Sequence, residues 1–168
     1  MSSWGNNDNA ANAPYWAVNS TIVNAADVKA VAAATADGAF YNNGQSCCAV
    51  ERIYVHEAVY EQYVSEFVQE VKSWKVGNPT EAGVYIGPLS RKSQIEFLEE
   101  QVKDAVKKGA SVLTGGKAID GEGYYFEPTV LTDVNHQMDV MREESFGPII
   151  GIMKIVQSPP GISNMPVC

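Results

Sequence analysis

An apolar run followed directly by an amphipathic helical pattern is the feature that most constrains the fold of this chain. Residues 49–55 are rich in β-branched and other apolar side chains and predict a strand. After His56 and Glu57, apolar side chains recur three and four positions apart, which predicts a helix with one buried face. Gly77-Asn78-Pro79 marks the end of this helical segment. The apolar positions are Tyr60, Tyr63, Val64, Phe67, Val68 and Val71.

Two further helices are expected from cap residues and periodicity. Asn24 stands where it could cap an Ala-rich helix from Ala25 to about Ala39, after a short strand at 15–18. The segment 77–88, with its glycines and prolines, is expected to be a loop. Ser90 is the expected cap of the next helix, which has a regular apolar stripe. That stripe consists of Ile95, Leu98, Val102, Ala105 and Val106.

The remaining apolar segments are short and predict strands. A buried strand is expected at 111–114, extended segments at 124–126 and 129–131, and a long apolar strand at 148–155. Strands that alternate with amphipathic helices indicate an α/β fold with a largely parallel sheet flanked by helices.

Composition excludes several classes of function. With 168 residues the chain has the size of one domain. No apolar run approaches the roughly 20 residues that span a bilayer, so no membrane partner is expected. The first 23 residues hold no Lys or Arg, which argues against a signal or transit peptide. The formal net charge of −8 opposes binding to phosphate backbones, so we expect no nucleic-acid partner.

The cysteines and histidines do not form a disulfide framework or a metal site. Two of the three cysteines, Cys47 and Cys48, are adjacent, and a bridge between neighbours is strained. A reducing, cytoplasmic location is therefore expected. His56 and His136 stand apart and are interpreted as surface or capping residues, so no metal is expected.

The turn around the adjacent cysteines allows two interpretations. Two small, buried and inert core residues are the plainer one, because free cysteine is commonly buried. A nucleophile is the other, because the turn lies between a helix and a strand, where open α/β sheets place their chemistry. Gly44 allows a tight backbone there, and Gln45 can hold the loop by hydrogen bonds.

Four motifs in the same order resemble those of the NAD(P)-dependent aldehyde dehydrogenases. Residues 40–47, Phe-Tyr-Asn-Asn-Gly-Gln-Ser-Cys, are similar to the family's active-site signature. Gly87-Pro88 with Gln94, the segment 123–131, and the segment 142–148 resemble three further family motifs. The resemblance covers about residues 14–156 and implies a partial catalytic domain of that fold.

The resemblance implies roles for six residues. Cys47 would be the catalytic nucleophile, flanked by Ser46 and Cys48 at the substrate pocket. Glu144 would bond the nicotinamide ribose, Phe146 would pack beside the nicotinamide, and Gln94 would contact a ribose. The alternatives are a surface carboxylate for Glu144, a core aromatic for Phe146, a solvated helix residue for Gln94 and core packing for Cys48.

Parts of the family pattern have no counterpart in these residues. They are the dinucleotide-binding domain, the Glu that acts as general base and the side-chain Asn of the oxyanion hole. Residues 1–13 and 157–168 are expected to lie outside the family domain and to be disordered. The resemblance thus implies the catalytic-domain part of an enzyme that oxidises an aldehyde with NAD or NADP and is inactive alone.

Two alternatives stay open. One is a non-catalytic structural or interaction module derived from the same fold, and the other is a truncated or frame-shifted reading. A homo-oligomer is expected in each case, because surface that a missing domain would cover is left exposed.

Overall fold

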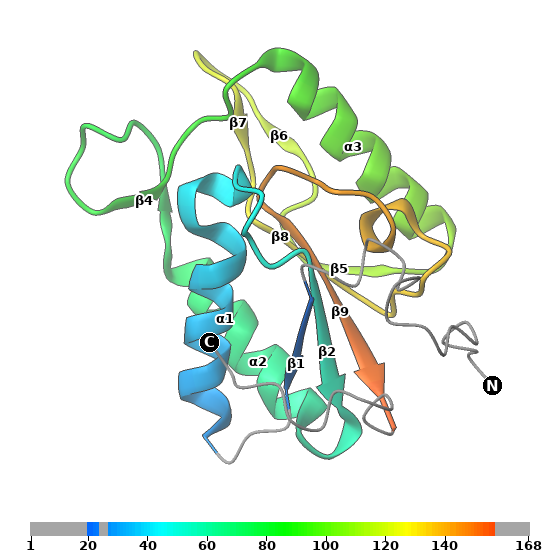
Figure 1. Ribbon diagram of the computed structural model, residues 1–168. Coiled ribbons are helices and arrows are strands. Elements are labelled where there is room, and N and C mark those ends of the chain that lie inside the picture. Colours follow the sequence, from blue (N-terminus) through cyan, green and yellow to red (C-terminus); the bar gives the residue numbers. More distant parts are fainter. Residues whose placement is uncertain (1–19, 24–26, 157–168) are drawn as a thin grey trace.

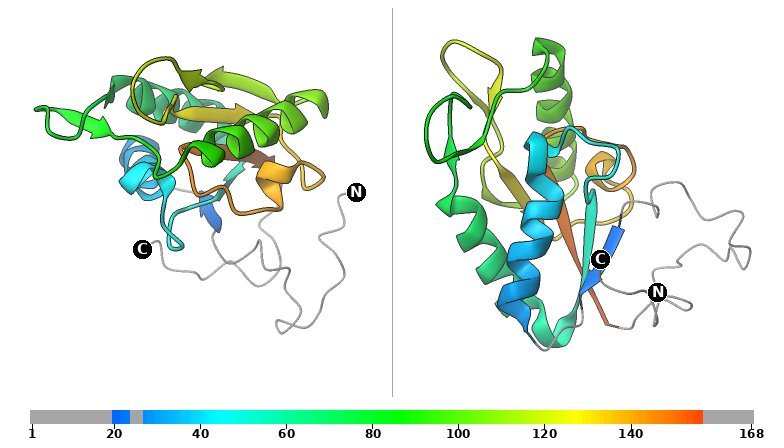
Figure 2. Two further views of the ribbon diagram at one scale, coloured as in Figure 1. Left: turned by 90° about the horizontal axis from the view of Figure 1, so that it is seen from above. Right: turned by 60° about the vertical axis from the view of Figure 1, so that its left-hand side comes forward.

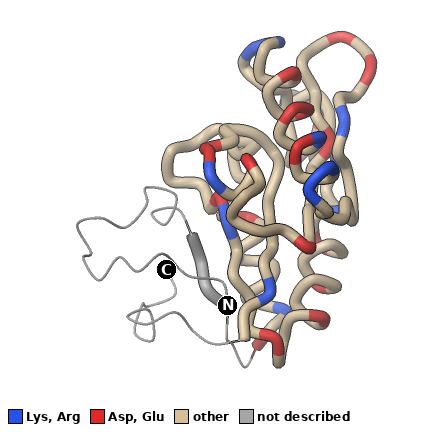
Figure 3. The backbone as a smooth tube through the Cα atoms, turned by 90° about the vertical axis from the view of Figure 1, so that its right-hand side faces the viewer, with Lys and Arg blue, Asp and Glu red and all other residues tan. Residues whose placement is uncertain are grey.

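The computed structural model describes residues 20–23 and 27–156 (Figure 1). The strand expected at 15–18, the expected cap Asn24 and the third cysteine, Cys168, lie outside these residues. Among the described residues, no helix combines the length and hydropathy needed to cross a membrane. Lys and Arg are interspersed with Asp and Glu along the described backbone (Figure 3).

A five-stranded sheet forms the centre of the fold, and most of it is parallel. Its strand order is β1 (Ser20–Val23), β2 (Arg52–His56), β9 (Ile149–Ile155), β8 (Thr129–Thr132) and β5 (Ser111–Thr114). The first four strands run parallel, and β5 pairs with β8 in the antiparallel sense. The predicted α/β fold with a largely parallel sheet is confirmed.

Helices cover both faces of the sheet (Figures 1 and 2). Helices α1 (Val28–Phe40) and α2 (Glu57–Ser73) lie side by side and share one apolar core with Ile53 and Val55 of β2. Helix α3 (Lys92–Lys107) packs in a second core with Tyr54, whose side chain points to the opposite face. This alternation follows from the period of two in a strand, and it explains why β2 is apolar on both sides.

The predicted helix after β2 is confirmed together with its cap. His56 is the N-cap of α2, and its Nδ1 accepts a hydrogen bond from the Ala58 N–H at 3.2 Å. His136 differs from its expected surface or capping role. It is half-buried, and its Nε2 lies 2.9 Å from the Tyr54 hydroxyl in a hydrogen bond.

The two other helices begin at residues that differ from the expected ones. Helix α1 starts at Val28, where the Asp27 carboxylate accepts the Ala30 N–H at 3.0 Å, so Ala25 was too early a start. Helix α3 starts at Lys92 with Arg91 at its N-cap, because the hydroxyl of Ser90 is used by another residue. Val106 was wrongly placed in the buried stripe, since it is 48% exposed.

Strand β5 is exposed, although a buried strand was expected there. It lies at the edge of the sheet, and its Val112 and Leu113 side chains reach solvent. A short run of apolar residues does not by itself distinguish an edge strand from a central strand.

Short elements complete the fold. The segment 77–88 was expected to be a loop, but it contains β4 (Val84–Ile86), which pairs with β3 (Lys75–Val76). Strands β6 (Ala118–Ile119) and β7 (Tyr125–Phe126) form an antiparallel pair, and the 3-10 helices are η3 (Tyr41–Gly44) and η4 (Asp139–Met141).

Candidate functional site

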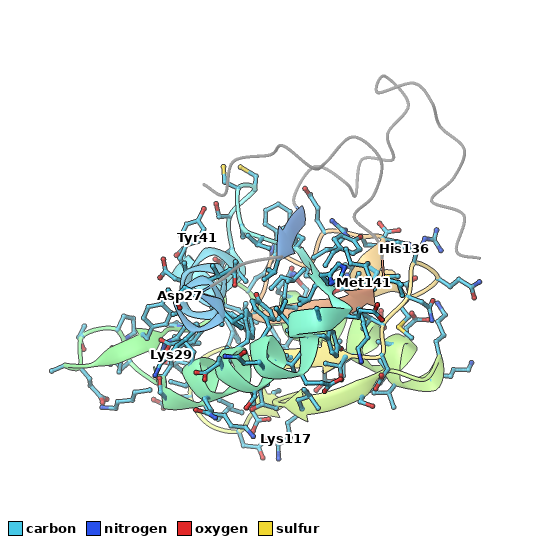
Figure 4. All side chains as sticks on the ribbon, turned by 90° about the horizontal axis from the view of Figure 1, so that it is seen from below. Asp27, Lys29, Tyr41, Lys117, His136 and Met141 are labelled. Atoms are coloured by element: carbon cyan, nitrogen blue, oxygen red, sulfur yellow. The ribbon has the colours of Figure 1, made fainter. Side chains whose placement is uncertain are left out.

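The loop between α1 and β2 has an unusual backbone that reverses the chain. Asn42, Asn43 and Gly44 have φ values of 50°, 60° and 68°, all in the left-handed region. Asparagine and glycine tolerate this conformation better than other residues do. Figure 4 shows Tyr41 at the end of α1, on one side of the molecule, with Met141 and His136 on the other.

Gly44 packs directly against the segment before β9. A Cβ atom at this position would lie 2.2 Å from the Gly147 carbonyl oxygen, far closer than atoms can approach. Only glycine therefore allows both the backbone conformation and the contact. The contact links the cysteine loop to the segment 142–148, which was singled out in the sequence.

Gln45 ties the loop to the turn before α3. Its Oε1 accepts hydrogen bonds from the Ser90 N–H and hydroxyl, at 2.8 and 2.7 Å, and its Nε2 donates to the Pro88 carbonyl at 3.4 Å. Asn43 adds a bond from its Nδ2 to the Gly87 carbonyl at 3.1 Å. The hydrogen bonds expected of Gln45 are present, and they explain why Ser90 does not cap α3.

The two thiols stand at the exposed tip of this anchored loop. Cys47 and Cys48 are both exposed and not disulfide-bonded, and their Sγ atoms are 3.9 Å apart. The interpretation as a buried core pair is therefore wrong, including core packing as the alternative for Cys48. Ser46 accepts the Cys48 N–H with its Oγ at 3.3 Å and shares a hydrogen bond with the Tyr41 hydroxyl.

The Cys48 thiol is affected by its neighbour. The hydrogen bond and the charge of the neighbouring Cys47 raise the pKa of the Cys48 thiol above its usual value. Because the thiolate is the nucleophile, this shift lowers the reactivity of Cys48 near neutral pH.

The segment 142–148 lies beside this loop and carries the residues that resemble cofactor contacts. Glu144 and Phe146 are each half-buried, so neither is a fully solvated carboxylate nor a fully buried core aromatic. Phe146 has a φ of 45°, which is rare for a bulky residue. The Glu144 carboxylate makes no hydrogen bond or ion pair with the other residues that the structure describes, so its oxygens are available to a ribose.

Gln94 is half-buried and engaged within the protein. Its Nε2 donates to the Ser145 carbonyl at 2.6 Å, so it is not the solvated helix residue of the alternative reading. Its Oε1 and its second Nε2–H make no hydrogen bond with the other residues that the structure describes. The residue thus joins α3 to the segment that holds Glu144 and Phe146.

The four motifs meet in space. Besides the contacts of the cysteine loop, the Leu89 N–H donates to the Tyr124 carbonyl at 2.7 Å, and the Thr129 N–H donates to the Pro148 carbonyl at 2.8 Å. The site is therefore one hydrogen-bonded assembly. Within the described residues, no group of three or more His, Cys, Asp or Glu side chains could hold a metal ion.

Glu51 and Arg52 are the residues that the sequence patterns missed. Both side chains are buried, and both form hydrogen bonds with the segment 141–146. The available signal was a pair of opposite charges inside an apolar strand pattern, since such charges are buried only when they are satisfied.

Comparison with known proteins gives consistent results. The profile described as "Aldehyde dehydrogenase family" matches residues 17–162. Lactaldehyde dehydrogenase of Escherichia coli (strain K12) is 38% identical over 133 residues, which are 79% of this chain and 28% of that protein. Succinate-semialdehyde dehydrogenase [NADP(+)] of Mycobacterium avium (strain 104) is 42% identical over 113 residues, 67% of this chain and 24% of that protein.

Solved structures agree in fold as well as in sequence. A 3,6-anhydro-L-galactose dehydrogenase in complex with NAP superposes with a TM-score of 0.77 at 41% identity, covering 81% of this chain and 29% of that one. The succinate-semialdehyde dehydrogenase from Burkholderia pseudomallei gives a TM-score of 0.78 at 39% identity and covers 82% and 29%. The chain thus spans less than a third of the length of the relatives it matches.

Proposed function

Because this chain belongs to the aldehyde dehydrogenase family, we propose that it is the part of an aldehyde-oxidising enzyme that carries the nucleophile, Cys47. The observation that supports this most strongly is the build of the loop. Gly44 and Gln45 lock it against two other segments, and yet the thiols at its tip are exposed. The anchoring holds the sulfur atoms in a defined position, which a nucleophile needs in order to reach its substrate.

The chemistry proposed for Cys47 is nucleophilic attack by its thiolate. The sulfur forms a bond to the aldehyde carbon, and the π electrons of the carbonyl move to its oxygen. The backbone N–H of Cys47 is proposed to donate to that oxyanion. Ser46 and Cys48 flank the nucleophile and are proposed to contact the substrate.

NAD or NADP, when bound, supplies the hydride acceptor that converts the thiohemiacetal on Cys47 into a thioester. Glu144 is proposed to bond the ribose, and Phe146 to pack beside the nicotinamide. Gln94 is proposed to contact a ribose through its side-chain amide. Hydrolysis then adds water to the thioester carbonyl and returns the electron pair of the C–S bond to sulfur, which releases a carboxylic acid.

The substrate class proposed is a small aldehyde. Among the relatives, the enzyme of E. coli is named for lactaldehyde and that of M. avium for succinate semialdehyde and NADP(+). Either nicotinamide cofactor is compatible with this proposal.

The 168 residues on their own are proposed not to turn over aldehydes at a normal rate. The general base and the side-chain oxyanion donor that the family resemblance implies have no counterpart within them. Each such group contributes on the order of 10²- to 10⁴-fold to a rate. Robust NAD(P)-dependent oxidation by the purified 168-residue chain would contradict this proposal.

Self-association is part of the proposal. The edge strand β5 presents the apolar side chains of Val112 and Leu113, and unpaired strand edges invite pairing between chains. Sedimentation velocity at rising protein concentration measures this directly. A single monomer species over the whole range would refute it.

Alkylation by iodoacetamide tests Cys47 as the nucleophile. We expect the peptide that carries both thiols to be labelled first at Cys47, with Cys48 slower because its pKa is raised. Mass spectrometry of fragment ions distinguishes the two positions. Cys48→Ser is the matched control and should keep the fast labelling, whereas Cys47→Ser should lose it. A Cys47 thiol slower than free glutathione would favour the non-catalytic module instead.

A further inference from the structure

Two adjacent buried, charged side chains at the start of β2 form hydrogen bonds with one short segment. One binds carbonyl groups of that segment, and the other binds its amide groups. Glu51 is 4% exposed and Arg52 is 1% exposed. The Arg52 Nε donates to the Met141 carbonyl at 2.9 Å, and its terminal NH2 group donates to the Glu143 carbonyl at 2.7 Å. The guanidinium thus binds the carbonyl groups that precede Glu144.

Glu51 binds the amide groups that follow. Its Oε1 and Oε2 both accept the Ser145 N–H, at 3.2 and 3.1 Å, and Oε1 also accepts the Phe146 N–H at 3.5 Å. Successive N–H groups near a left-handed residue form a concave anion site. Here that site is filled by a carboxylate of the same chain.

Burying the Glu51 carboxylate and holding Phe146 in a left-handed conformation both cost free energy. Burial raises the pKa of Glu51, and the Ser145 amide and the Arg52 charge oppose that shift. A Phe residue with a φ of 45° costs free energy as well, and it persists only where its surroundings hold it. The Glu51 carboxylate accepts the amides on both sides of Ser145, so it fixes the plane of the Ser145–Phe146 peptide from which the φ of Phe146 is set.

We propose that Glu51 is a positioning residue: by binding the Ser145 and Phe146 amides, its buried carboxylate fixes the segment that presents Glu144 and Phe146 beside the cysteine loop. The inference rests on the proposed function, since it assigns a purpose to the side chains that the function uses. Glu51 also lies four residues after Cys47, and Gly147 touches Gly44. The same short stretch of chain therefore carries the nucleophile and holds its neighbouring segment.

Glu51→Gln is the variant that tests this, because glutamine keeps the shape and loses one acceptor. Its NH2 group would face the N–H groups that the carboxylate accepts. We expect amide exchange at Ser145 and Phe146 to be faster by on the order of 10- to 100-fold, as for a lost charge-assisted bond. The φ-sensitive NMR coupling of Phe146 should change, and amides of α2 should keep their exchange rates. Glu143→Gln is the matched control, because it removes a charge next to Glu144 and leaves the Glu51 carboxylate in place. The exchange rates and the Phe146 coupling should stay unchanged in this variant.

The wild-type chain offers a second measurement that does not depend on the variant folding. The Ser145 amide shift should follow the titration of the Glu51 carboxyl, with Arg52 as the charged group that faces it. A Ser145 amide shift that follows the carboxyl shows that this hydrogen bond holds the segment in solution.

Two outcomes would overturn the inference. One is unchanged exchange and an unchanged Phe146 coupling in a folded Glu51→Gln variant. The other is a Ser145 amide shift that stays flat while the carboxyl titrates. Failure of the proposed function looks different, because it appears as slow alkylation of Cys47 in the wild-type chain.

Discussion

Replacing Gly44 with alanine should distort the cysteine loop more than any other single methyl group added to it. The added Cβ would lie 2.2 Å from the Gly147 oxygen and 2.7 Å from its carbon, whereas real contacts stay beyond 3.0 Å. Both of the close atoms belong to backbone, so one of two anchored segments has to move by roughly an ångström.

Gly83→Ala separates the clash from the backbone strain. Gly83 has a φ of 77°, close to the 68° of Gly44, but a Cβ there would meet nothing within 4 Å. Left-handed backbone alone costs alanine about 1 kcal/mol, which is the expected effect of Gly83→Ala. Overpacking adds roughly 1–3 kcal/mol at Gly44, so Gly44→Ala should lower the free energy of unfolding by about 2–4 kcal/mol.

Urea unfolding monitored by tryptophan fluorescence measures both values. With an m-value of roughly 2 kcal/mol/M, the midpoint should fall by about 1–2 M for Gly44→Ala and by about 0.5 M for Gly83→Ala. The Cys47 alkylation rate should change in Gly44→Ala and stay the same in Gly83→Ala. Equal midpoint shifts in the two variants would refute the reasoning, since the contact with Gly147 would then carry no energy.

Three further variants test other contacts. Gln45→Leu removes the acceptor of the Ser90 N–H and hydroxyl, which water can reach, and should cost about 0.5–1.5 kcal/mol in urea unfolding; a neutral result would show that these bonds are dispensable. Arg52→Met leaves the Met141 and Glu143 carbonyls without their donor and removes the cation near the buried Glu51 carboxylate, so it should cost about 3–5 kcal/mol in thermal unfolding; a stabilised variant would contradict the double contact. Burial, and secondarily the Arg52 charge, lowers the pKa of His136 below 6.5, so the unfolded chain binds its proton first as the pH falls and stability drops below about pH 6.5. That drop should shrink in His136→Asn, and an unchanged pH profile of the urea midpoint would exclude this contribution.

The sequence alone predicted the order of the three long helices and of strands β2, β5, β8 and β9. Local periodicity is enough for that, because a period of two or of 3.6 decides which residues share a face. The helix after β2 and its His56 cap were therefore predictable. The Gly44-Gln45-Ser46-Cys47 turn was singled out as a candidate site because it resembles the active-site signature of the family.

The tertiary structure decided which polar groups meet. Ser90 has the features of a helix cap, and Gln94 those of a solvated helix residue, yet both bond partners that lie about 50 positions away in the chain. Strand β5 has the apolar residues typical of a buried strand, but its side chains are exposed because it lies at the edge of the sheet. No local pattern encodes these outcomes, because each depends on which distant segment lies alongside.

Glu51 and Arg52 show the physical reason most clearly. The sequence shows two charged residues in an apolar run. Burying a charge costs so much free energy that both must have hydrogen-bond partners, but the sequence does not reveal which groups these are. The two charges gain their hydrogen-bond partners only when β2 pairs with β9, because this pairing brings the amides and carbonyls of residues 141–146 within reach. The candidate nucleophile Cys47 was therefore singled out by a short motif that resembles the family's signature, whereas the residues that hold its neighbours became evident only in the fold.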